Sequence, residues 1–97
     1  MEYKVGDYII TNWFAETVKI LSVEEEGVIV LTPFFVTYEN GDVAFRQCEI
    51  EFNDIVNFST KATFLQDAKN NFTEYQNDIN QRLTKMQNLI ISSEVID

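Results

Sequence analysis

The chain of 97 residues contains no histidine, one cysteine, one proline, three glycines and only seven lysines and arginines. Without histidine, the usual zinc sites and histidine-based acid–base catalysis are excluded. A single cysteine cannot form an internal disulfide, so the chain is not a disulfide-stapled secreted domain. No basic-then-apolar leader opens the sequence, and its longest wholly apolar run, Val28 to Leu31, is too short to span a bilayer. We therefore expect a cytoplasmic protein of a bacterial or infected host cell, without a cofactor and without membrane contact.

Positive charge is scarce and unevenly placed. Residues 1–58 carry a net charge of −8, whereas residues 59–97 carry −1. Proteins that bind nucleic-acid phosphates carry the opposite charge. We therefore expect no direct binding of nucleic acid. We also expect two parts, an acidic barrel-like domain over residues 1–58 and a C-terminal amphipathic helix over residues 59–97.

Short β-rich runs fill the first 58 residues. The runs 17–23 and 28–31 are separated by three glutamates and Gly27, which predicts a hairpin. A second hairpin is predicted at Asn40-Gly41, because this pair favours a two-residue type I′ turn, in the register that pairs Tyr38 with Val43. Beyond this turn the apolar phase shifts by one residue, which predicts a bulge or sharp bend near residues 46–47. Residues 55–58 supply a last short strand.

The sequence period changes at Ser59-Thr60, where either residue can cap a helix. Apolar side chains then recur at steps of three and four over about 30 residues, which is typical of an amphipathic helix. Such a helix is longer than a small barrel is wide, so it overshoots the barrel or breaks once, and residues 92–97 are expected to fray. The predicted fold class is α+β, with a small antiparallel, strongly bent sheet or barrel followed by a long C-terminal helix.

The apolar stripe of this helix has three interpretations. It packs on the barrel, it pairs with the same helix of a second copy to form a homodimer, or it binds a groove of another protein. The self-association candidates are the large apolar residues of the stripe: Leu65, Phe72, Tyr75, Ile79, Leu83, Met86 and Leu89.

No catalytic signature is present, so we expect no enzyme. We interpret Cys48 as buried and unreactive, because its acidic neighbour Glu49 raises a thiol pKa. The pair Trp13-Phe14 falls in the first loop, where it either covers one end of the barrel or forms an exposed aromatic anchor for a partner. The acidic side chains predicted to meet a partner are Glu24, Glu25, Glu26, Glu39, Asp42, Glu49 and Glu51.

The run Tyr3-Lys4-Val5-Gly6-Asp7-Tyr8-Ile9, followed by the strands of the first hairpin, resembles the opening of Src-homology-3-like small barrels. The resemblance covers residues 3–58 and implies a fold, since this group hosts many functions. The composition is similar to that of small acidic proteins of phages and mobile elements in low-GC bacteria.

The leading functional hypothesis is a non-enzymatic binding module whose acidic body engages a basic protein surface. A phage-type inhibitor that occupies the nucleic-acid groove of a host defence enzyme, such as a CRISPR nuclease, would have this character. In the simplest alternative, the charge only keeps a small protein soluble. The second functional hypothesis is a structural or assembly subunit that self-associates through its C-terminal helix.

Overall fold

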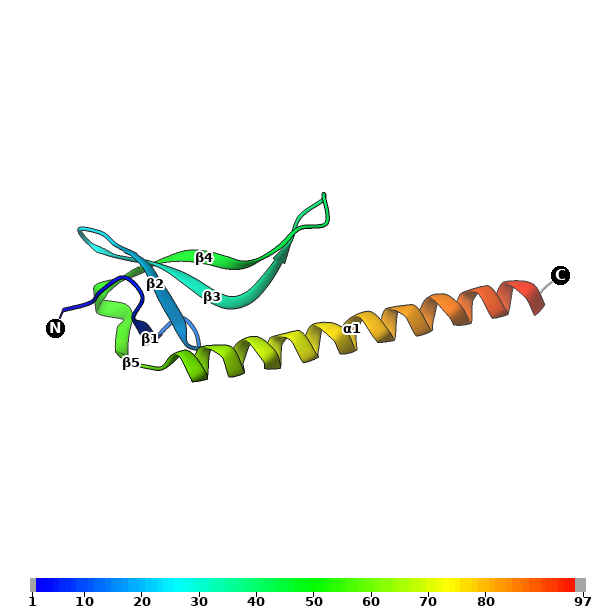
Figure 1. The fold of residues 1–97 in the computed structure, drawn as a ribbon. Helices are drawn as coiled ribbons and strands as arrows, with labels where there is room; N and C mark the ends of the chain where they lie inside the picture. Colours follow the sequence, from blue (N-terminus) through cyan, green and yellow to red (C-terminus); the bar gives the residue numbers. More distant parts are fainter. Residues whose placement is uncertain (1, 96–97) are drawn as a thin grey trace.

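The computed structural model describes residues 2–95, which form a five-stranded antiparallel sheet followed by one long helix (Figure 1). The elements are β1 (Tyr8–Thr11), β2 (Val18–Val23), β3 (Gly27–Thr37), β4 (Val43–Glu51), the short 3-10 helix η1 (Phe52–Asp54), β5 (Ile55–Phe58) and α1 (Lys61–Val95). The predicted α+β class, with the sheet first and the long helix last, is confirmed.

The sheet is open. Its strand order is β4-β3-β2-β1-β5, and among the described residues no pairing joins the two edge strands β4 and β5. Of the two predicted forms, a bent sheet or a barrel, the described residues therefore have the open sheet. Strand β5 has only four residues, and its cross-strand partners all lie in β1, so its outer edge stays unpaired among the described residues.

The main core lies on one face of this sheet. Alternating residues of the strands point inward, so Val18 and Ile20 of β2 are fully buried while Lys19 between them is only half-buried. The buried apolar cluster consists of Ile9, Val18, Ile20, Val28, Val30 and Ile50. The first hairpin is formed as predicted, and the Glu24 amide donates to the Gly27 carbonyl across its turn at 2.8 Å.

The turn of the second hairpin differs from the prediction. The Tyr38 amide donates to the Asp42 carbonyl (2.9 Å), and the Gly41 amide donates to the Tyr38 carbonyl (3.0 Å). The loop therefore has three residues, and Thr37, rather than Tyr38, pairs with Val43. A type I′ turn needs a positive φ at both central residues, including Asn40, whereas this loop needs it only at Gly41, where φ is +92°. The predicted type I′ turn and its register are wrong by one residue.

The predicted bend is confirmed, with the extra residues in the neighbouring strand. Three residues of β3, Thr32 to Phe34, lie opposite the single residue Arg46 of β4. Pro33 sits in this bulge, since it has no amide to donate to the sheet. The Thr32 hydroxyl donates to the Arg46 carbonyl at 2.9 Å, which satisfies part of the interrupted ladder.

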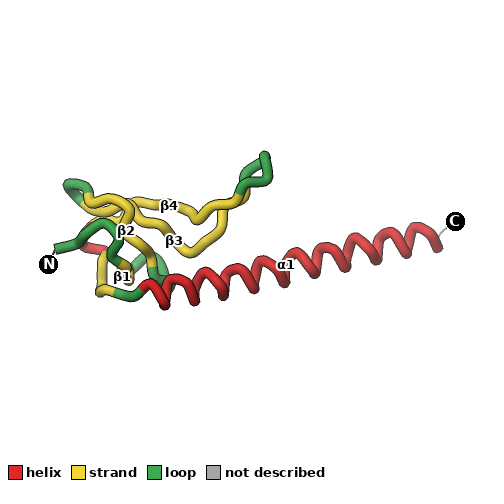
Figure 2. The backbone as a smooth tube through the Cα atoms, in the orientation of Figure 1, coloured by secondary structure: helices red, strands yellow, loops and turns green. Residues whose placement is uncertain are grey.

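Helix α1 begins at the predicted cap. The Thr60 hydroxyl accepts the amide of Thr63 at 3.1 Å, which satisfies one of the free amides of the first turn. The helix then runs without a break and projects well beyond the sheet (Figures 1 and 2). It continues through Val95, so residues 92–95 are helical rather than frayed, and the same expectation for residues 96–97 lies outside the described residues.

Only the first three turns of α1 pack on the sheet. The Phe64 ring is buried and lies 5.7 Å from the Tyr8 ring and 5.4 Å from the Phe45 ring, measured between centroids. The Asp67 carboxylate accepts the Thr17 amide at 2.9 Å. A second polar contact follows one turn later, where the Asn71 amide group donates to the Pro33 carbonyl at 2.8 Å. These contacts fix the direction in which the helix leaves the body.

Candidate functional site

Two acidic segments that are far apart in the sequence meet at the end of the first hairpin. The antiparallel register places Glu51 of β4 opposite Gly27 and Glu49 opposite Ile29, beside the turn that carries Glu24 and Glu26. The Phe52 amide donates to the Glu26 carbonyl at 3.3 Å, which holds the end of β4 against this turn. The hairpin thus brings together residues that the sequence shows only as two separate acidic runs.

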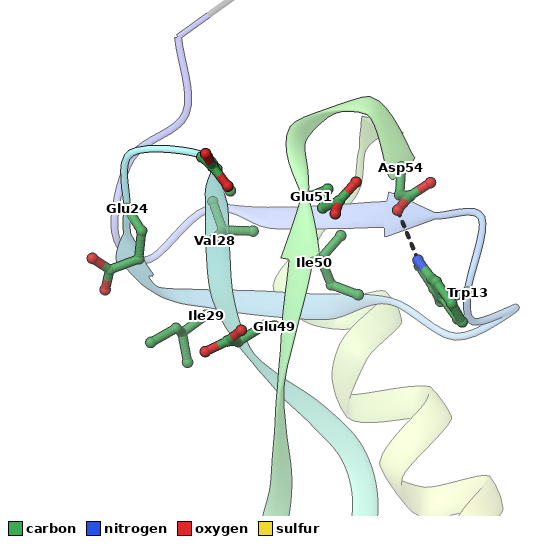
Figure 3. A pocket seen from close by; sticks show the side chains of 10 residues that line it. Trp13, Glu24, Val28, Ile29, Glu49, Ile50, Glu51 and Asp54 are labelled. Carbon is green, nitrogen blue, oxygen red and sulfur yellow. Dashed lines mark hydrogen bonds between the residues drawn. The ribbon is translucent and has the colours of Figure 1, made fainter.

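A surface depression of about 370 Å³ lies between these segments (Figure 3). Its lining contains five carboxylates, from Glu24, Glu26, Glu49, Glu51 and Asp54, and we call these side chains with Trp13 the acidic depression. The remaining lining residues are Gly27, Val28, Ile29 and Ile50. None of the lining residues is basic, so the depression has a single sign of charge.

Trp13 lies at the rim of the acidic depression. Its indole N–H donates to the Asp54 carboxylate at 2.9 Å, which joins the first loop to η1 (Figure 3). The Asn12 amide also donates to the Asp54 carbonyl at 2.8 Å, so this junction is held at two points. Trp13 nevertheless remains 69% exposed. An oriented, exposed indole in a depression that acidic residues line is suited to hold the stem and charge of a lysine or arginine.

The two residues of the predicted aromatic anchor have different surroundings. Phe14 is half-buried, its ring lies 5.7 Å from the Phe34 ring, and it packs against the main core. Only Trp13 of this pair is presented to solvent. Phe14 therefore covers the core, as one interpretation of the loop predicted, while Trp13 is exposed and held by Asp54; its role as an anchor for a partner stays a prediction.

The predicted acidic surface is divided between two places. Glu39 and Asp42 lie at the tip of the second hairpin, at the opposite end of the β3–β4 ribbon from the acidic depression (Figure 1). There the Asn40 side chain donates to the Asp42 carboxylate and accepts the Asp42 amide, both at 3.0 Å. These contacts order the turn. Glu25 is exposed at the first turn but does not line the depression.

Asp54 was not among the predicted binding residues. It ends η1, the short 3-10 helix between β4 and β5. Its place in the site depends on the contact with Trp13, 41 positions earlier in the chain. No local pattern predicts that pairing.

Cys48 is half-buried in β4, rather than fully buried as predicted. Burial raises the pKa of its thiol, and the nearby Arg46 charge lowers it by less. The expectation of a raised pKa is confirmed, but the cause is desolvation rather than the neighbouring Glu49. A protonated thiol is a poor nucleophile.

The predicted self-association residues lie along α1. Leu65 is 44% exposed although it belongs to the docked turns, because the sheet contacts Phe64 and Ala68 instead. Phe72, Tyr75, Ile79, Leu83, Met86 and Leu89 follow on the projecting part and are all exposed.

Within the described residues, no group of three or more cysteine, aspartate or glutamate side chains is placed to hold a metal ion. The part of the chain that the structure describes also has no helix that combines the length and the apolarity needed to cross a membrane. No protein-family model matches the sequence, and no curated protein matches it significantly.

Proposed function

We propose that this protein is a non-enzymatic binding module that receives a lysine- or arginine-bearing segment of a partner protein in its acidic depression. The observation that carries the proposal is the set of five carboxylates around one depression that has no basic residue in its lining. The ion pair that the structure records, between Arg82 and Asp78, lies on α1 and leaves these carboxylates uncompensated.

The electrostatics favour a basic ligand for two reasons. The body that bears the depression has a net charge of −8, so its field steers a positive segment toward the surface from a distance. Within the depression, a cation bound beside one carboxylate also weakens the repulsion between that carboxylate and the neighbouring ones. Trp13 adds an aromatic face for a cation and a large surface for the stem of its side chain.

The acidic depression favours a particular kind of partner protein. Strongly basic surfaces are typical of proteins that bind nucleic acid, because they neutralise phosphates. An acidic module that covers such a surface competes with the nucleic acid and inhibits the partner. We therefore propose a phage-type inhibitor of a host defence or nucleic-acid enzyme, such as a CRISPR nuclease, as the specific role. The five-stranded antiparallel sheet is also compatible with kinship to Src-homology-3-like barrels, which we propose at the level of fold alone.

The intrinsic fluorescence of Trp13, the chain's only tryptophan, tests the proposal directly. A peptide of alternating lysine and glycine is titrated into the protein at about 20 mM and about 500 mM salt, which changes the Debye length several-fold. We expect a saturable change in the Trp13 signal at low salt and a much weaker affinity at high salt. Equal affinity at both salt concentrations, or binding of duplex DNA by the protein itself, contradicts the proposal.

A matched pair of variants separates the depression from the overall charge. Glu49→Lys with Glu51→Lys reverses two charges in the depression, and Glu39→Lys with Asp42→Lys reverses two at the other hairpin tip. We expect the first variant to lose about tenfold or more in affinity and to show a flatter salt dependence. The second variant has the same net charge and is expected to bind within about threefold of the parent. Equal losses in both variants would mean that net charge, and not the depression, attracts the peptide.

A further inference from the structure

The projecting part of α1, residues 72–93, is solvent-exposed although many of its side chains are apolar. We call it the distal helix; its 22 residues span about 33 Å at 1.5 Å per residue. All its residues are exposed. A helix this rich in asparagine and glutamine has a modest intrinsic propensity, so packing must supply much of its stability.

One side of the distal helix is apolar. Seven large side chains recur at helical spacing and are 36–69% exposed: Phe72, Tyr75, Ile79, Leu83, Met86, Leu89 and Ile90. At 100° per residue they fall within a strip of about 120°, continuous with the face that packs on the sheet through Phe64 and Ala68. At about 100 Å² for each half-exposed large side chain, the strip exposes on the order of 700 Å². That area is close to one side of a standard protein interface, about 800 Å².

The charges of the distal helix are segregated along its length. Glu74 and Asp78 lie in its first half, Arg82 lies at its middle and Lys85 lies in its second half. Two such helices in parallel would place acid beside acid and base beside base. In antiparallel order, the acids of one copy face the bases of the other.

The acidic bodies favour the same orientation. A parallel pair would place two bodies of net charge −8 side by side, whereas an antiparallel pair holds them at opposite ends. We propose that two copies of this protein associate through their distal helices in antiparallel order. The apolar strip, its area and the charge order together specify a second copy of this chain as the occupant.

The spacing sets a register for this pair, centred near Asn80. Phe72 then lies across from Leu89 of the second copy, and Tyr75 lies across from Met86. Arg82, the one basic residue on the strip, lies across from Ile79, where its charged end reaches Asp78 of the second copy. Asp78 already pairs with Arg82 within one chain at 3.1 Å, so this pairing extends an existing contact. The register pairs residues 72–89 of the two copies and leaves Ile90 outside the paired segment.

The mass in solution tests the association. Light scattering at about 100 μM is expected to give twice the chain mass of 11.3 kDa for the parent protein. Ile79→Asp places a charge in the strip and should lower the association constant by about tenfold or more. Gln81→Asp adds the same charge on the opposite side of the helix and should leave the mass unchanged. Both sites lie outside the docked turns, and near-ultraviolet circular dichroism checks that each body remains folded.

Cysteine cross-linking tests the orientation. In a Cys48→Ala background, Tyr75→Cys and Met86→Cys are prepared as separate proteins. The antiparallel register predicts no disulfide dimer in either protein alone and a disulfide dimer when the two are mixed and oxidised. A disulfide dimer in each protein alone would indicate a parallel pair and would overturn the proposal.

Two other results of the mass measurement would overturn the proposed dimer. A parent protein of 11.3 kDa at this concentration overturns the proposal and leaves the strip to a different protein. A dimer that is unchanged by Ile79→Asp places the interface elsewhere and equally overturns it. Neither result bears on peptide binding in the acidic depression, which is measured separately through Trp13.

Discussion

Gly41 and Gly27 are required for different physical reasons. Gly41 has a φ of +92° at the tip of the second hairpin, and a Cβ there would meet no atom within 4 Å. Gly27 has an ordinary φ, but a Cβ there would overlap the Ile50 carbonyl oxygen and lie 3.0 Å from the Glu51 Cα. The first position is restricted by backbone conformation and the second by the close approach of β4.

The two glycines should therefore respond differently to substitution. Gly41→Val is expected to lower the free energy of unfolding by about 1 kcal/mol or more, and Gly41→Asn by less, because asparagine tolerates a positive φ. Gly27→Ala is expected to cost about 1–3 kcal/mol, because β4 must move, and Gly27→Asn at least as much. Urea denaturation measures all four variants. If asparagine is the milder substitution at Gly27 as well, steric contact with β4 is not the cause there.

The attachment of α1 to the sheet depends on one side chain above all. Phe64 is buried between the rings of Tyr8 and Phe45, whereas Phe72, two turns later, is 53% exposed. Removal of a buried phenylalanine ring costs about 3–5 kcal/mol, a large share of the stability of a domain this small. Phe64→Ala should therefore unfold the protein at much lower urea concentration than the parent needs.

Phe72→Ala is the matched control for this effect, since it removes the same ring from the same helix. At low micromolar concentration, where association is weak, its urea midpoint should stay near that of the parent. A loss at Phe72 equal to that at Phe64 would show that the distal helix packs on its own body. Such a result would contradict the docking of only the first three turns.

The molecule as a whole is elongated. Its extents are 69 × 24 × 19 Å, and its radius of gyration is 18.9 Å, compared with about 13 Å for a compact chain of 97 residues. The difference comes from the distal helix, which extends away from the body (Figure 2).

Small-angle scattering of the Ile79→Asp variant, diluted until it is monomeric, should give a radius of gyration near 18.9 Å. The charge lies on the exposed strip and leaves the docked turns intact, so the shape of one chain is expected to persist. A value near 13 Å would mean that the helix folds back on the sheet in solution.

Much of this arrangement follows from patterns between near neighbours in the sequence. The β-branched runs predicted the strands, Asn40-Gly41 predicted a turn, and Thr60 with the three–four spacing predicted the helix and its apolar strip. Each of these signals depends on backbone preferences or on periodicity within one element, so it is present before the chain folds. The excess of acid in the first 58 residues is likewise a property of composition.

The tertiary structure decided what depends on contacts between distant residues. It selected Phe64 rather than Leu65 for the sheet, because the Phe64 ring is the one that reaches the rings of Tyr8 and Phe45. The one-residue shift of the second hairpin has a local cause instead, because only Gly41 of that turn accepts the positive φ at low cost. The acidic depression again depends on distant contacts, and it arose when the register of β3 and β4 brought Glu24 and Glu26 beside Glu49 and Glu51. Strand register and helix docking are set by packing across the chain, which no local pattern encodes.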